Sequence, residues 1–144
     1  MFKIKSLLGA TLLVGMTTIG WQSSIKAEQK TALGNLYSEE FLTQVSNMMN
    51  STLPMIVEEG VRWDSSYAGP GKTLSYNYTM LDYSASEIDG KMLANTIRPD
   101  LTDTICTTPE TQLFPNNGVL LNFNYYGRDR NLITRIEVAP DDCK

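Results

Sequence analysis

The segment VLLNFNYYGRDRNLITRIEV, residues 119–138, constrains the fold most, because it alternates on both sides of a turn and lies between the only two cysteines. Apolar residues take every second position from Val119 to Tyr125, and again after the turn GRDRN. Period-two alternation indicates strands with one buried and one wet face. The segment is therefore predicted to form a β-hairpin.

A second hairpin is predicted upstream, where the runs GVRWDSSY and KTLSYNYTM alternate in the same way around the turn AGPG. In its first strand, Val61, Trp63, Ser65 and Tyr67 are expected on one face, and Arg62, Asp64 and Ser66 on the other. The sequences of the two hairpins can be aligned at an offset of 58 residues, which aligns Gly69 with Gly127. Such a match is too thin to prove a duplication.

Helical spacing precedes each hairpin. Between Ser38 and Thr52, apolar residues recur at steps of three and four, and Ser38 is placed to cap the first turn. The face so defined consists of Phe41, Val45, Met48, Met49 and Thr52. A second helix, capped by Ser84 or Ser86, is expected to stop at Pro99, with a short piece over 100–106 and another turn after Thr108 and Pro109.

These elements predict an α+β fold. Two α-β-β units would form a four-stranded antiparallel sheet with helices packed on one face. The length suits one domain after removal of a leader, and we predict a single α+β domain over 28–144.

The N-terminus has the features of a secretory signal peptide, which we predict over 1–27. Lys3 and Lys5 precede an apolar run that ends near Gly20, and Ala27 offers a small-residue cleavage site. A membrane anchor is the alternative, but the run is shorter than the ~20 residues that a spanning helix needs. The protein is therefore expected to be periplasmic or secreted, with no membrane span after cleavage.

The charge balance argues against two classes of partner. Cleavage would remove three of the 12 basic side chains and none of the 16 acidic ones, which leaves a mature net charge of −7. A chain this acidic has no means of neutralising phosphates, so nucleic acid is not an expected partner. Anionic membrane surfaces are disfavoured for the same reason.

Cys106 and Cys143 form an even pair in a chain that we expect to be exported, so a disulfide is predicted. Closing a loop of 37 residues would stabilise the fold by roughly 3 to 4 kcal/mol. A redox-active pair is the alternative, but such cysteines usually stand close together, as in C-x-x-C.

No catalytic or metal motif is found. The chain has no histidine, which removes the commonest general base and zinc ligand. Three pairs of carboxylates remain, and each is explained as solvated or helix-capping charge. They are Glu58 with Glu59, Asp100 with Asp103, and Asp141 with Asp142. We therefore predict no enzyme activity and no cofactor.

The wet face of the sheet is the candidate binding face. Asparagine is unfavourable in strands, so a partner or ligand would explain the three that occur there. The alternative is that they keep an exposed face soluble and discourage edge pairing. The candidate residues are Arg62, Asn77, Asn122, Asn124, Tyr126 and Arg135.

The block from Cys106 to Cys143 resembles the end of the α/β type of type II secretion pilotins, small periplasmic proteins that escort secretin subunits to the outer membrane. The matching positions are Cys106, Pro109, Gly118 and Cys143. The resemblance implies a disulfide-stapled, helix-flanked sheet whose groove receives a protein segment. Family members are lipoproteins, whereas no cysteine stands near the predicted cleavage site.

We therefore predict a small exported, non-catalytic binding or accessory protein with a pilotin-like fold, whose partner is a protein segment. The alternative is an inhibitor or immunity-type protein that blocks an extracytoplasmic enzyme with the loops AGPG and GRDRN. A histidine-free hydrolase that uses carboxylates ranks last.

Overall fold

Helix α3, Glu39–Asn50, begins the part of the chain that the computed structural model describes, residues 36–144. The predicted signal peptide lies outside these residues and stays a prediction. Ser38 caps α3 as expected, since its hydroxyl accepts a hydrogen bond from the Phe41 N–H at 3.2 Å. The expected buried face was partly wrong: Leu42 and Ser46 are buried, whereas Met48 is 73% exposed.

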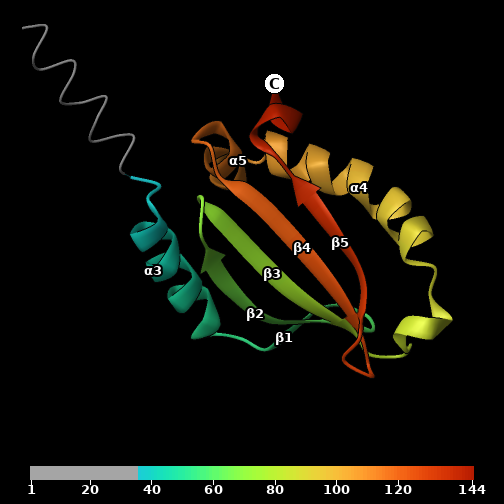
Figure 1. Cartoon of the computed structure of the whole chain (residues 1–144). Helices are drawn as coiled ribbons and strands as arrows, with labels where there is room; N and C mark the ends of the chain where they lie inside the picture. The colour runs from blue at the N-terminus through green and yellow to red at the C-terminus, as the bar shows by residue number, and fades with distance from the viewer. Residues whose placement is uncertain (1–35) are drawn as a thin grey trace, which may run out of the picture. The chain divides into compact units, whose positions relative to one another are not determined.

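The sheet has five strands in the order β1-β2-β3-β4-β5 (Figure 1). The four expected strands are β2 (Val61–Gly69), β3 (Thr73–Met80), β4 (Leu120–Gly127) and β5 (Leu132–Val138). The fifth, β1 (Met55–Glu58), pairs antiparallel with β2 at one edge. Its sequence, MIVE, is an apolar run too short to show alternation, so it was not predicted as a strand.

The expectation of an all-antiparallel sheet was wrong, because β3 and β4 are parallel. Between them runs a crossover of η1 (Ala85–Glu87), α4 (Gly90–Thr107) and α5 (Pro109–Asn116). This connection brings the chain back to the end of the sheet where β3 began, and the Leu120 N–H donates to the Lys72 carbonyl at 2.9 Å. A connection of this length with helices is what a parallel pair requires.

The crossover corrects two further predictions. Pro99 does not interrupt the second helix, because α4 runs through it in one piece. Asp89, rather than Ser84 or Ser86, caps α4 by accepting hydrogen bonds from the N–H groups of Lys91 and Met92. The turn expected after Thr108 and Pro109 is confirmed as α5.

A β-bulge at Asp64 in β2 corrects the faces predicted for that strand. Trp63 lies opposite Tyr78, but the register shifts so that Ser65 lies opposite Asn77. The alternation therefore slips by one residue. Ser65 and Tyr67 come to the open face, whereas Ser66 turns to the core, where it is 2% exposed.

The predicted disulfide between Cys106 and Cys143 is confirmed, with 5.1 Å between the two Cα atoms. It fastens the last short helix, η2 (Pro140–Cys143), to the C-terminal end of α4. Chain termini fray unless something ties them down, so the bond holds the end of β5 in place.

The helices all pack on one face of the sheet, as predicted. Helix α3 packs on β2, α4 on β5 and α5 on β4. In the view of Figure 1, α3 lies along the left margin of the sheet, α4 along the right margin, and α5 near the top between them. The core lies under them, with Leu42, Leu74 and Leu121 fully buried. No helix among the described residues has the length and apolar character that spanning a membrane requires.

Candidate binding groove and polar sheet face

The helical layer does not cover the whole sheet, and a groove of about 540 Å³ opens between α4 and the β1 edge. Leu74 and Leu121 are fully buried at one end of the central strands, but Tyr78 and Met80 at the other end are only half-buried. The groove is lined by Val57, Glu58, Val61, Tyr78, Met80, Thr96, Ile97, Asp100, Leu101, Thr104 and Tyr125.

Aromatic rings form the floor of the groove. Tyr78 on β3 stacks on Tyr125 on β4, with 5.2 Å between ring centroids, because the parallel register places them side by side. Trp63 on β2 stacks on the other side of Tyr78 at 6.1 Å. The three neighbouring strands therefore present a continuous aromatic row, of the kind that dominates binding energy at protein interfaces.

Both floor tyrosines are neutral. Burial raises the pKa of Tyr78, and the nearby hydroxyls of Tyr125 and Tyr76 add to the effect. Burial also raises the pKa of Tyr125, with a further contribution from the negative charge of Glu58. The floor therefore offers uncharged rings at any physiological pH.

The walls of the groove carry two carboxylates, Glu58 on β1 and Asp100 on α4. The expectation that Asp100 is a charge at the start of a helix is wrong, since Asp100 lies ten residues after Gly90 within α4. Reasoning from the sequence missed the groove itself. Ile97, Leu101 and Thr104 have helical spacing that continues across Pro99, which would have revealed this wall of α4 had the helix not been divided there.

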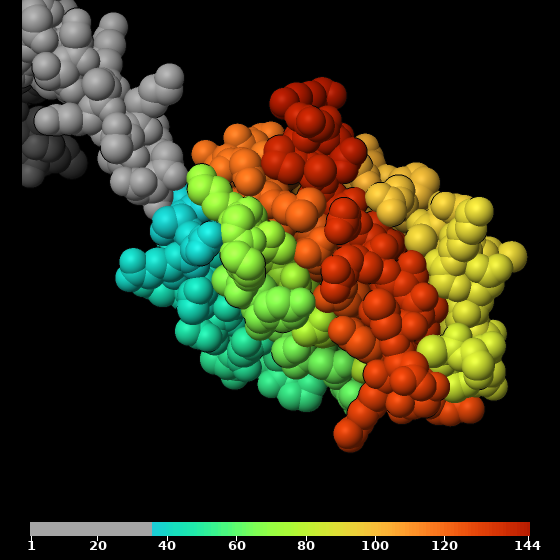
Figure 2. Space-filling model, viewed as in Figure 1, coloured from blue at the N-terminus to red at the C-terminus, as the bar shows by residue number. Residues whose placement is uncertain are grey.

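The other face of the sheet is polar and has no helix over it, and strand residues occupy the centre of this face in Figure 2. Its side chains form a row of hydrogen bonds across four strands. Asn77 Nδ2 donates to Ser65 Oγ at 3.0 Å, and Asn124 Nδ2 donates to Asn77 Oδ1 at 2.9 Å. Arg135 Nε then donates to Asn124 Oδ1 at 2.7 Å.

This row accounts for asparagines in the strands. Asn124 is fully buried by its neighbours, and its amide is satisfied on both sides. Asn122 is 7% exposed and donates to Ser75 Oγ at 3.4 Å, while its Oδ1 has no partner among the described residues. For Asn77 and Asn124 the hydrogen bonds offset the poor strand propensity of asparagine without a ligand, but for Asn122 they do so only in part.

Three residues of the candidate binding face gather around a second hollow, of about 360 Å³. Arg62, Asn77 and Tyr126 line it, and Arg62 is paired with Asp64. Asn122, Asn124 and Arg135 share the face but do not line this hollow. That the polar face binds a partner stays a prediction.

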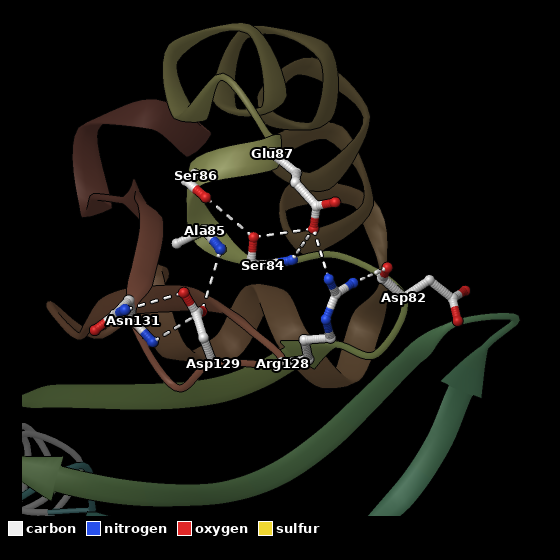
Figure 3. Close-up of polar contacts among 8 residues, drawn as sticks. All are labelled: Asp82, Ser84, Ala85, Ser86, Glu87, Arg128, Asp129 and Asn131. Carbon is white, nitrogen blue, oxygen red and sulfur yellow. Dashed lines mark hydrogen bonds and ion pairs between the residues drawn. The ribbon is translucent and has the colours of Figure 1, made fainter.

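The turn GRDRN is fastened to the start of the crossover (Figure 3). Arg128 pairs with Glu87 at 3.1 Å and donates to the Asp82 carbonyl. Asp129 Oδ1 accepts from the Ala85 N–H at 3.1 Å, and Asn131 Nδ2 donates to Asp129 Oδ2 at 3.0 Å. Three of the four non-glycine side chains of this turn, which the inhibitor alternative expects to contact an enzyme, are thus engaged within the chain.

Metal-binding groups do not gather anywhere in residues 36–144, where no three acidic or cysteine side chains are arranged to hold an ion. The disulfide itself is typical of proteins from an oxidising compartment.

Comparison with known proteins gives matches in structure alone. No family model and no curated protein sequence matches the chain. A candidate secreted protein of Pseudomonas aeruginosa has a similar structure, with a TM-score of 0.64 and 13% identity over 74% of this chain and 92% of that one.

Two pilotins of type 2 secretion systems are also similar. EpsS of Vibrio vulnificus has a TM-score of 0.60 and 10% identity over 82% of this chain and 97% of its own. AspS of Vibrio cholerae has a TM-score of 0.57 and 12% identity over 82% and 98%. The resemblance that the C-terminal block predicted is therefore confirmed at the level of the fold: this chain folds like the pilotins.

Proposed function

We propose that this protein is an exported, non-catalytic accessory protein that binds a segment of a partner protein in the groove between α4 and β1. The observation that carries the proposal is the aromatic floor of stacked Tyr78 and Tyr125, of which Tyr78 is left half-buried where the helical layer ends. Large rings at the base of an apolar groove are the usual anchoring sites for a partner's side chains.

The surroundings of the groove favour a macromolecular partner over a small ligand. Met55 and Val57 on β1, the edge strand that forms one wall of the groove, are 42% and 43% exposed. Met55 lies opposite Trp63, so the apolar surface continues beyond the groove along β1. Contiguous exposed apolar surface of this kind marks protein interaction sites.

The pilotin fold supports the same reading. Both pilotins in the comparison belong to type 2 secretion systems. A secretin subunit is therefore the first partner to test, although at 10 and 12% identity no contact residue carries over from the pilotins to this chain.

Site-specific photo-crosslinking in the native cell envelope tests the proposal. A benzoylphenylalanine would replace Thr104 in the groove, Gln44 on the exposed side of α3, Arg135 on the polar face or Arg130 in the turn GRDRN, each in a separate variant. The proposal predicts a defined adduct from the Thr104 position and none of the same species from the Gln44 position.

Two matched arginine variants show whether the adduct depends on the groove. Ile97→Arg places a long side chain inside the groove and is expected to abolish the adduct, whereas Asn95→Arg on the exposed side of α4 is expected to retain it. An adduct from Arg135 alone would assign binding to the polar face. One from Arg130 alone would favour the inhibitor or immunity-type alternative.

A further inference from the structure

We infer that the groove selects a basic partner: an amphipathic helix of about four turns whose apolar stripe is flanked by lysine or arginine. This inference rests on the proposed function and adds the chemistry of the occupant. It is drawn from the charges on the groove walls, the shape of the helical layer and the length of the hollow along α4.

The charged residues that line the groove are both acidic. Glu58 lies on the β1 wall and Asp100 on the α4 wall, and no lysine or arginine is among the lining residues. Neither carboxylate takes part in an ion pair within residues 36–144. Two unpaired negative charges therefore flank an apolar floor on opposite sides.

The charge of Glu58 affects the floor of the groove as well as its β1 wall. Its charge contributes to the raised pKa of Tyr125, so its carboxylate lies near the phenol at the base of the groove. Glu58 is exposed, so a cation on the occupant would meet this charge at the water-accessible edge of the groove, where the attraction weakens as salt rises. An acidic occupant would meet two like charges, which disfavours it.

The neighbouring hollow extends the same character along α4. It has a volume of about 300 Å³, shares Thr96 with the groove, and is lined by Asp89 and Glu87 as well as apolar Met92 and Leu93. Glu87 is offset by Arg128, but Asp89 has no ion-pair partner among the described side chains. Together the two hollows follow α4 from Asp89 to Thr104, which corresponds to about 22 Å of helix at ~1.5 Å per residue.

A helix fits this space better than a strand. The groove lies on the face of the sheet that α3, α4 and α5 cover elsewhere, so an occupant there continues the helical layer. An added strand would instead pair with the outer edge of β1 and leave the aromatic floor uncovered. If the apolar stripe of the occupant helix lay over the rings, the residues that flank this stripe would lie beside Glu58 and Asp100.

Binding of three designed peptides to the purified exported protein tests the inference. The 18-residue peptides share one leucine stripe at helical spacing, and their flanking positions carry lysine, glutamine or glutamate. Affinities are measured by fluorescence anisotropy at low and high salt. The lysine peptide is expected to bind most tightly and to weaken as salt rises.

Two double variants with the same change in net charge provide the control. Glu58→Gln with Asp100→Asn neutralises the groove, whereas Glu59→Gln with Asp103→Asn neutralises a neighbouring exposed acid on each of the same segments. The groove pair is expected to weaken binding of the lysine peptide about four- to twenty-five-fold, since each charge pair contributes roughly two- to fivefold. The control pair is expected to change it less than twofold.

The outcomes separate the two claims. If all three peptides bind equally, or if both double variants bind the lysine peptide alike, the charge selection is overturned while groove binding stands. If no peptide binds, or if binding survives Ile97→Arg, the groove does not hold a helix and the proposed function fails with the inference.

Discussion

At the scale of single residues, close packing of the backbone can require a residue type that helix propensity alone would disfavour. Gly90 is the first residue of α4, although glycine is a poor helix former. A Cβ atom there would lie 2.2 Å from the Ile133 carbonyl oxygen on β5. Glycine therefore allows α4 to approach the sheet, which the sequence by itself does not show.

Replacing Gly90 with alanine tests this close approach. Helix propensity predicts a gain of about 1 kcal/mol, whereas the contact with Ile133 predicts a loss of roughly 1 to 3 kcal/mol in the free energy of unfolding. Urea unfolding distinguishes the two signs. Gly69→Ala serves as the control, because its Cβ would stand 3.7 Å from the nearest atom, and it is expected to change stability little.

The polar row across the sheet gives a second prediction at this scale. Asn124→Ala leaves Asn77 and Arg135 without their partner and is expected to lower the free energy of unfolding by about 1 to 3 kcal/mol. In a double-mutant cycle with Asn77→Ala, the two losses are expected to be non-additive. Strictly additive losses would mean that the row does not act as a connected network.

At the scale of elements, periodicity predicted the positions of most helices and strands but not how the strands pair. The two hairpins, α3 and α5 have the expected places, because each carries a local apolar pattern or cap. β1 has no such pattern. The β-bulge at Asp64 involves a hydrogen bond to its side chain from Thr79 on the neighbouring strand β3, which no local pattern indicates. The groove forms between distant elements, so no single segment of the sequence indicates it.

The disulfide is an element-scale contribution to stability. Cys106→Ser with Cys143→Ser is expected to lower the free energy of unfolding by roughly 3 to 4 kcal/mol, because the unfolded chain regains the freedom of a 37-residue loop. Reduction of the wild-type protein is expected to lower the thermal midpoint in the same way. A midpoint that stays unchanged on reduction would show that the bond does not support the fold.

The contacts of the turn GRDRN make stability depend on acid. Hydrogen bonds from Ser84, and then the charge of Arg128, lower the pKa of Glu87, while hydrogen bonds from Asn131 and the Ala85 N–H lower the pKa of Asp129. Ionised carboxylates of lowered pKa stabilise the fold above their ordinary pKa of about 4, and this contribution is lost as pH falls through the lowered values.

Glu87→Gln tests this dependence, since the variant retains a side chain of similar size without the titrating group. Urea midpoints measured from about pH 6 to about pH 2.5 are expected to fall less steeply for the variant than for the wild type. Parallel curves would show that the contacts in Figure 3 do not contribute to acid stability.

At the scale of the whole molecule, the fold class and the helix-covered face followed from the sequence, but the sheet topology did not. Two hairpins of similar pattern suggest two repeated units, yet the return of the chain through α4 and α5 makes their junction parallel. That junction places Tyr78 beside Tyr125 and so creates the floor of the groove. The likeness to pilotins concerns this same whole-chain arrangement.

The most direct test of the account is an NMR titration of the labelled protein with the lysine peptide or with a segment identified by crosslinking. Groove binding predicts that the ring signals of Tyr78 and Tyr125 and the methyl signals of Ile97 and Leu101 shift most. The signals of Asn124 and Arg135 are expected to remain unchanged. Shifts confined to the polar face or to the turn GRDRN would contradict the proposed function.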